Sequence, residues 1–343
     1  MKKYRSNLLT MQKNTRMRIN IFAILFLLLS STTFGQNPSE LKITHKLSIL
    51  NSRAFFQFPD SAKNIARSVG IMSADPNANK ETRIMFDIGK QRLVFFAREL
   101  YETCNGDLLA AINKDNSGDE TIKILTNKDS LLSVLITPKQ PDTSGEAILI
   151  NNLFVRMPDN SLFVIGAYIN LDAYKNKNDF QVLTEKVFST LTKGPRNLNL
   201  RARTETIPIF GTKKNFTVPL PQGFVVTRDA KYDFQVLNFK KVKDISDTNW
   251  LSLTIYTGNH PSYFYPEYDF DESRAEKAGG NFLNKNVEWL RFTDPGKPLH
   301  LKEQQIPSDQ IENGLIIHIA MLGNSQAAID ELSRLIEKIK VTQ

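Results

Sequence analysis

Apolar and polar residues alternate along much of the chain, as expected for β-strands that bury one face. The stretch GLIIHIAML (314–322) shows the alternation clearly, because Leu315, Ile317, Ile319 and Met321 fall on one face at period two. His318 belongs to the opposite row. We therefore expect His318 on a solvent-exposed or helix-covered face of this strand, and not as a metal ligand.

Two segments repeat their apolar residues at helical spacing instead. The pattern predicts one helix over 178–192 and a second over 325–340. The residues that share a face are Phe180, Leu183, Val187 and Leu191 in the first segment, and Ile329, Leu332, Ile336 and Ile339 in the second. Each segment therefore offers one apolar face for packing on a sheet.

The ends of these helices carry capping residues. Asn178 or Asp179 can cap the first helix, and Asn324 or Ser325 can cap the second. Gly194 is placed to end the first helix.

The same order of predicted elements occurs twice along the chain. LSILNSRAFFQFPDSAKNI (47–65) and IPIFGTKKNFTVPLPQGFV (207–225) each contain two short strands, a polar turn and a bend near proline. Each is followed by two strands, a polar or helical connection, three strand-like runs and a closing helix. KGPRNLNLRARTETIP (193–208) combines a Gly-Pro break with a polar basic run, which is typical of a linker.

We therefore predict two tandem, similar domains over residues 36–194 and 208–343, joined by a linker over 195–207. Each domain is expected to hold a mainly antiparallel sheet of about six strands with its C-terminal helix packed on it, which is the α+β class. One continuous domain with accidental symmetry is the alternative.

The paired N-terminal strands, the phrase PQGF (221–224), the strand meander and the closing helix together resemble the PsbP/Mog1/DcrB-like superfamily. The first half has PDSAKN where the second has PQGF. The resemblance implies a non-enzymatic accessory or binding protein, and it supplies no catalytic motif to transfer.

The first 35 residues have the order of a secretory signal peptide. Six basic residues and no acidic ones precede IFAILFLLL (21–29), and Thr33 and Gly35 form a small-x-small site. We predict cleavage near Gly35/Gln36, and a periplasmic or secreted location. The apolar run is shorter than the roughly 20 residues of a membrane-spanning helix. The true start could be Met1, Met11 or Met17.

Cleavage changes the charge balance. The full chain carries +8, but six of its 44 Lys and Arg residues lie in the signal, which leaves 38 basic and 36 acidic residues, or +2. A near-neutral chain without basic blocks is not typical of nucleic-acid binding. The remaining chain has no further segment long and apolar enough to cross a membrane. Its oligomeric state is open.

The chain lacks the usual sequence signatures of catalysis. It has none of the nucleophile-elbow, zincin, P-loop or dinucleotide-binding motifs, and its four histidines are well separated. Cys104, the one cysteine, is expected to be buried or half-buried and cannot form an internal disulfide. We predict no metal site, no cofactor and no catalytic residue, although an unrecognised hydrolase stays open.

The stretch NHPSYFYPEYDFDESRAEKAGG (259–280) concentrates aromatic and acidic residues. Tyrosine and phenylalanine are enriched in the cores of protein interfaces, so Tyr263, Tyr265, Tyr268 and His260 are the candidate partner-contact residues. The alternative is that the rings cover the protein's own sheet. We expect Phe264 and Phe270 to be buried, the tyrosine hydroxyls to reach water, and a short helix over 271–284.

These features favour an exported, non-catalytic binding or accessory protein of the cell envelope with a protein partner. The alternative is a protein that binds a small apolar ligand between sheet and helix or between the domains.

Overall fold

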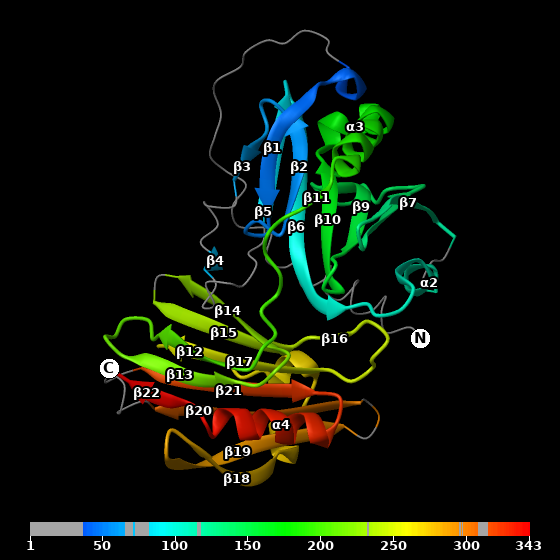
Figure 1. The fold of residues 1–343 in the computed structure, drawn as a ribbon. Helices are drawn as coiled ribbons and strands as arrows, with labels where there is room; N and C mark the ends of the chain where they lie inside the picture. The colour runs from blue at the N-terminus through cyan, green and yellow to red at the C-terminus, as the bar shows by residue number, and fades with distance from the viewer. Residues whose placement is uncertain are drawn as a thin grey trace.

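The fold is built almost entirely from antiparallel sheets, with a few helices packed on them (Figure 1). The structure, a computed structural model, describes residues 37–65, 71–72, 82–114, 118–231, 233–294, 296, 298–307 and 315–343. The signal segment predicted over 1–35 lies outside these residues. Within them, two large sheets and two small sheets form an α+β fold, as the sequence predicted.

The first half contains a small sheet of order β1-β2-β11 and a large sheet that includes the path β3-β5-β6-β10-β9-β8-β7. The strands are β1 (Ile43–Ile49), β2 (Ala54–Pro59), β3 (Lys63–Asn64), β5 (Thr82–Ile88), β6 (Gln91–Thr103), β7 (Glu120–Lys128), β8 (Leu131–Pro138), β9 (Ile148–Arg156), β10 (Ser161–Ile169) and β11 (Thr192–Lys193). The helical elements are η1 (Pro38–Glu40), α2 (Leu108–Asn113), η3 (Leu171–Asn176) and α3 (Lys177–Ser189).

The second half contains a small sheet of order β12-β13-β22 and a large sheet of order β18-β19-β20-β21-β17-β15-β14-β4. Its strands are β12 (Arg203–Pro208), β13 (Asn215–Leu220), β14 (Phe224–Lys231), β15 (Phe234–Lys241), β16 (Lys243–Asp244), β17 (Leu251–Gly258), β18 (Glu276–Phe282), β19 (Lys285–Asp294), β20 (Leu299–Pro307), β21 (Ile316–Gly323) and β22 (Lys340–Thr342). Its helical elements are η4 (Tyr265–Tyr268), η5 (Glu272–Arg274) and α4 (Gln326–Ile336).

Both large sheets follow one strand order. If the seven strands that each half contributes to its own large sheet are counted along the chain, they lie in the order 1-2-3-7-6-5-4 in both halves. Each half therefore contributes seven strands to its large sheet, one more than the sequence predicted. Each small sheet joins the first two strands of its half to the strand that follows the closing helix.

Each closing helix buries the face that its sequence period predicted. Phe180, Leu183 and Val187 of α3 are fully buried in the first core, and Ile329, Leu332 and Ile336 of α4 are buried in the second. Ser325 caps α4 by accepting a hydrogen bond from the Ala328 N–H at 3.2 Å, as predicted. The caps expected for the first helix are wrong, because α3 begins at Lys177 and places Asn178 and Asp179 inside its first turn.

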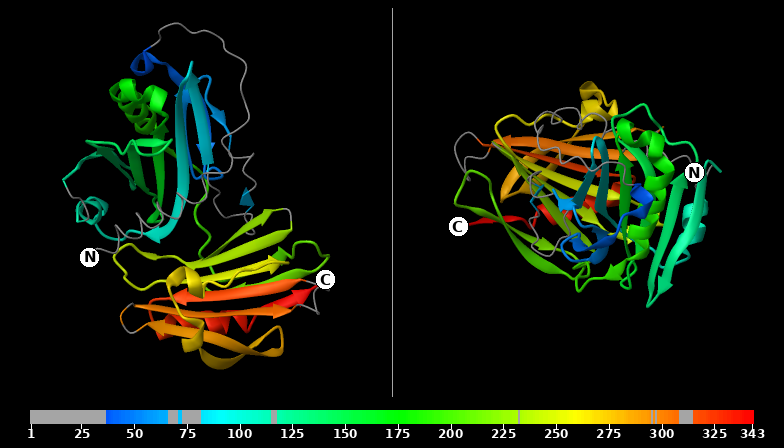
Figure 2. Two further views of the ribbon diagram at one scale, coloured as in Figure 1. Left: turned by 180° about the vertical axis from the view of Figure 1, so that it is seen from behind. Right: turned by 90° about the horizontal axis from the view of Figure 1, so that it is seen from above.

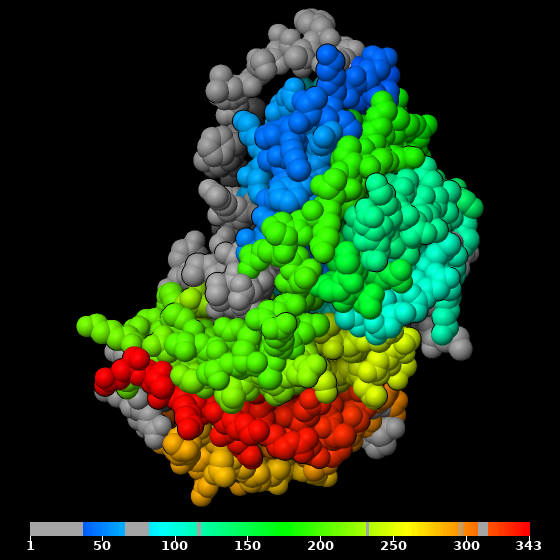
Figure 3. Space-filling model, viewed as in Figure 1, coloured from blue at the N-terminus to red at the C-terminus, as the bar shows by residue number. Residues whose placement is uncertain are grey.

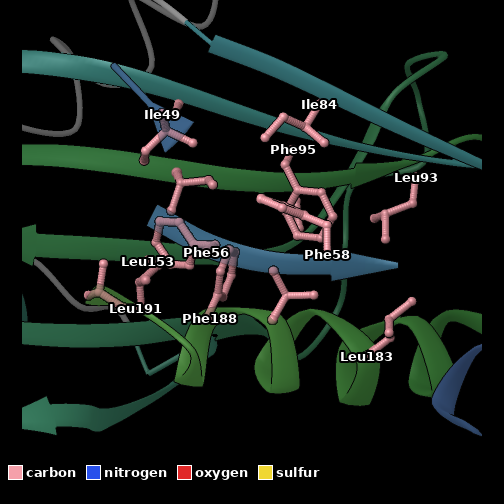
Figure 4. Close-up of a cluster of buried hydrophobic side chains, with 14 of the residues drawn as sticks. Ile49, Phe56, Phe58, Ile84, Leu93, Phe95, Leu153, Leu183, Phe188 and Leu191 are labelled. Atoms are coloured by element: carbon pink, nitrogen blue, oxygen red, sulfur yellow. The ribbon is translucent and has the colours of Figure 1, made fainter. Parts of the chain in front are cut away.

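Aromatic rings fill the space between the first sheet and α3 (Figure 4). The ring of Phe58 meets Phe95 edge-on at a centroid distance of 5.0 Å, and Phe95 meets Phe188 in the same way at 5.8 Å. Such edge-to-face contacts stabilise a core beyond the area that they bury. No helix within the described ranges is both long and apolar enough to cross a bilayer.

Each half adds one short strand to the large sheet of the other half, which the sequence did not predict. β16 of the second half pairs parallel to the end of β6, and β4 (Ile71–Met72) of the first half pairs antiparallel with β14. The Asp244 carboxylate strengthens the first contact, because it accepts hydrogen bonds from the Asn105 N–H at 2.8 Å and from Asn105 Nδ2 at 2.9 Å. Cys104 next to it is buried, as predicted.

The chain that leaves the first half corrects two predictions. α3 ends at Ser189, so Gly194 is not its cap; instead, a Cβ at position 194 would lie 1.9 Å from the Ser52 carbonyl oxygen. Only glycine allows this close approach of two backbone segments. The predicted linker over 195–207 is also too long, because residues 203–207 already belong to β12.

A buried polar cluster lies beside this connection. The guanidinium of Arg53 is fully buried and pairs with Glu99 at 3.3 Å and with Asp159 at 3.1 Å, and it also donates to Ser161. Asp159 Oδ2 in turn accepts a hydrogen bond from the Leu198 N–H at 3.3 Å. The cluster therefore ties the connecting segment to the first half.

Candidate functional site

The aromatic segment, defined as residues 259–275, joins β17 to β18 and lies on the face of the second sheet opposite α4 (Figure 2). Its rings pack against a small buried cluster formed by Phe292, Leu301, Ala320 and Leu322. The second sheet is therefore covered on both faces, by α4 on one and by the aromatic segment on the other.

β21 shows how one strand serves both layers. Ile317, Ile319 and Met321 belong to the core under α4, whereas Ala320 and Leu322 belong to the cluster under the aromatic segment. His318 lies in this second row and is 1% exposed. The expectation of a solvent-exposed or helix-covered histidine is therefore wrong, because the aromatic segment covers this face.

A buried carboxylate fixes the segment to the sheet. Glu303 of β20 is fully buried, and its two oxygens accept hydrogen bonds from the Phe264 and Tyr265 N–H groups, both at 2.8 Å. His318 Nε2 lies 2.8 Å from Glu303 Oε2. A buried charge is costly unless it is paired and hydrogen-bonded, and these three contacts supply that compensation.

The rings form a continuous aromatic layer above these anchors. Tyr263 and Phe264 both meet the His318 ring edge-on, at centroid distances of 5.5 and 5.3 Å. Tyr265 stacks on Phe292 at 5.2 Å and lies 5.6 Å from the Tyr263 ring. All five aromatic side chains of the segment are half-buried, so each has one side on the sheet and the other accessible.

Two of the three tyrosine hydroxyls are hydrogen-bonded within the protein. Tyr263 donates to Gln304 Oε1 at 2.9 Å, and Tyr265 donates to Glu272 Oε2 at 2.8 Å. Burial raises the pKa of Tyr263 and of Tyr268, whereas the hydrogen bond to Glu272 is the main cause that raises the pKa of Tyr265. All three phenol groups are therefore neutral at physiological pH.

The structure brings three of the four candidate contact residues together. Tyr263, Tyr265 and Tyr268 all belong to the aromatic layer, and each is half-buried. His260 is exposed at the start of the segment and makes no ring contact within the described chain. Phe264 and Phe270 were predicted to be buried, but both are only half-buried, like the tyrosines.

The expected helix over 271–284 is also wrong. Residues 272–274 form the single turn η5, and residues 276–282 form β18. Asp271 ends the aromatic turn by accepting hydrogen bonds from the Ser273 N–H at 3.0 Å and Oγ at 2.8 Å, which lower the pKa of Asp271. The glycine pair that follows disfavours a helix.

Sequence reasoning missed Glu303 and its neighbours. In LHLKEQQIP (299–307), Glu303 continues the row of Leu299 and Leu301 at period two. An acidic residue in a row of otherwise apolar, inward-facing positions indicates a buried carboxylate that needs hydrogen-bond partners. This pattern could have identified Glu303. In the described residues, no three His, Cys, Asp or Glu side chains are grouped so that they could hold a metal ion.

No known protein family matches the chain, and no curated protein is similar to it in sequence. Two solved structures show weak similarity. The Tle4-Tli4 complex matches at 12% identity over 88% of this chain and 98% of that chain, with a TM-score of 0.23. The immunity protein TplEi of T6SS from Pseudomonas aeruginosa, complexed with "L" peptide, matches at 11% identity over 86% and 96%, with a TM-score of 0.22. At these TM-scores, neither similarity carries an argument.

Proposed function

We propose that this chain is an exported protein of the cell envelope that binds another protein through its aromatic segment and catalyses no reaction. The observation that supports this function best is the attachment of the segment to Glu303. Two backbone N–H groups and a histidine hold the carboxylate, so the half-accessible tyrosine rings are presented on a fixed support.

A fixed aromatic surface is well suited to binding. Ordering a loop costs free energy on association, and a loop that is already ordered avoids much of that cost. Tyrosine contributes a large contact area with few rotatable bonds, and it is enriched among the residues that dominate interface energies. The exposed acids Glu267 and Asp269 surround the rings, as polar residues surround the apolar centre of an interface.

We also infer that the chain is exported and that its two halves are copies of one unit. The order of basic, apolar and small residues before Gln36 supports a cleaved signal. The common strand order of the two large sheets supports two copies of one unit, and the relation of that unit to the PsbP/Mog1/DcrB-like superfamily is part of the same proposal.

The binding function is tested by partner capture from the native envelope fraction, with immobilised mature protein. Glu267→Lys reverses an exposed charge beside the rings and should leave the melting temperature unchanged while capture falls at least tenfold. Asp172→Lys, an equally exposed reversal on η3, is the matched control and should capture normally. Capture that is absent with the wild type, or equal for all three proteins, would contradict the proposal.

The triple change of Tyr263, Tyr265 and Tyr268 to Ser should abolish capture and also lower the melting temperature, since each ring is partly packed on the sheet, Tyr263 through the His318 ring. Export is tested separately by sequencing the N-terminus of the protein recovered from the envelope. We expect Gln36, and an N-terminus at Met1, Met11 or Met17 would show that no cleavage occurs.

A further inference from the structure

β18 is the outermost strand of the second large sheet and has a regular edge. Each of its residues from Glu276 to Phe282 pairs with one residue of β19, without a register shift. Among the described residues, no strand pairs with its other side. Figure 3 shows this part of the chain at the margin of the molecule farthest from the first half. An outer strand with unpaired N–H and C=O groups is a template for another strand.

Two neighbouring glycines in the middle of β18 differ in what the fold requires of them. A Cβ on Gly280 would lie 2.7 Å from Trp289 Nε1, so the buried indole explains that glycine. A Cβ on Gly279 would meet nothing within 4 Å, and its backbone is not in the left-handed region. Glycine within a strand weakens it, and often marks a place where another backbone approaches closely. The protein's own packing gives no reason for Gly279.

The corresponding edge of the first large sheet is protected. β7 has a register shift between Ile124 and Thr126, and the exposed Lys123 and Lys128 lie along it. Bulges and lysines are the usual means by which proteins prevent pairing at sheet edges. In β18 the exposed charges, Glu276 and Lys277, lie at one end, and the central residues from Ala278 to Gly280 carry no charge, no proline and no bulge.

We propose that β18 is a homodimer interface, in which the strands of two copies pair antiparallel about a two-fold axis at Gly279. This inference concerns a different surface from the proposed partner site and does not depend on it. The second copy is the favoured occupant because the strand is compatible with itself in this register. Lys277 faces Asn281, Glu276 faces Phe282, and no like charges oppose each other.

The two-fold register also keeps both faces of the sheet consistent. Ala278 and Phe282 lie in the core under α4. In this register even-numbered residues of one copy oppose even-numbered residues of the other, so opposing side chains point to the same face of the sheet. Both copies of α4 therefore lie on one face of a continuous sheet, and both aromatic segments lie on the other. An isologous contact of this kind closes on itself and does not extend into a fibre.

A single cysteine tests the axis directly. In the proposed dimer the two residues at position 279 oppose each other at about 4.5–5.5 Å between Cα atoms, which permits a disulfide. We expect Gly279→Cys to form a covalent dimer of mature protein under mild oxidation. Asn281→Cys is the matched control on the same exposed row. Its two copies are separated by about four residues, or roughly 13 Å, and should not cross-link. Cys104 is buried and does not interfere.

Light scattering after size exclusion gives the second readout. The wild type should show twice the chain mass at micromolar concentration, whereas Gly279→Lys should be monomeric, because it places two like charges at the axis. The open space at Gly279 lets this variant keep its fold as a monomer, which its circular dichroism spectrum verifies. A monomeric wild type at high concentration would overturn the proposal. So would a Gly279→Cys variant whose new thiol reacts with maleimide but does not cross-link, or equal cross-linking of Gly279→Cys and Asn281→Cys.

Discussion

Glu303 and His318 lie diagonally across neighbouring strands, with 2.8 Å between Glu303 Oε2 and His318 Nε2. Both side chains are buried, and the backbone of the aromatic segment closes over them. The pair lies on the face of the second sheet opposite α4. It therefore connects the layer that covers this face to the sheet itself.

Replacing Glu303 with Gln should destabilise the protein by on the order of 3 kcal/mol, because an amide cannot accept all of the hydrogen bonds that the carboxylate accepts. Urea denaturation measures the loss, and faster tryptic cleavage at Arg274 should accompany it. Glu288→Gln is the control, since Glu288 pairs with Lys277 at the surface and its loss should cost less than about 1 kcal/mol. Equal effects of the two changes would rule out the anchoring role of Glu303.

Gly279 and Gly280 should respond oppositely to substitution by Ala in the monomeric protein. Gly280→Ala should cost about 1–3 kcal/mol, because its methyl group would press on the buried Trp289 ring. Gly279→Ala should be neutral or stabilising by up to about 1 kcal/mol, since the new methyl group enters open space and the unfolded chain loses freedom. Thermal denaturation at low protein concentration compares them. A large loss in Gly279→Ala would point to a packing role for that glycine.

Leu332→Asp should destabilise the second half by several kcal/mol, because Leu332 is fully buried on the inner face of α4 and an unpaired buried charge is among the costliest substitutions. Ala327→Asp provides the control in the same helix. Ala327 is exposed in the first turn, where a negative charge is favourable, so no loss is expected. Comparable urea midpoints for the two variants would contradict the assigned helix face.

Asp159 should contribute to the acid sensitivity of the protein. Burial favours its neutral form, but hydrogen bonds from Ser161 and the charge of Arg53 outweigh this and hold the pKa of Asp159 below its usual value of 3.8. Because the folded pKa is depressed, this contribution is fully present above the unfolded pKa and is lost as pH falls through the folded value.

The free energy of unfolding should therefore fall more steeply in the wild type than in Asp159→Asn as the pH falls below about 4. Denaturant titrations at several pH values measure both slopes. Asp172→Asn, an exposed change, should keep the slope of the wild type. Coinciding slopes for all three proteins would show that the Arg53 cluster does not contribute.

Local patterns were enough to predict much of the fold. The apolar spacing of 178–192 and 325–340 predicted α3 and α4 and their buried faces, and the alternation in 314–322 predicted β21. These signals are readable because a helix or strand shows its period within a few residues of chain.

The contacts that shape the candidate site depend on residues far apart in the chain. Glu303 meets Phe264 and His318 only when β20, β21 and the aromatic segment come together, and no local period encodes that meeting. The same holds for the pairing of β16 with β6, and for Gly194 against Ser52. Residue type alone showed that the aromatic segment was unusual. The tertiary structure decided which side of each ring lies on the sheet and which stays accessible. The burial of a side chain depends on which residues the folded chain places against it.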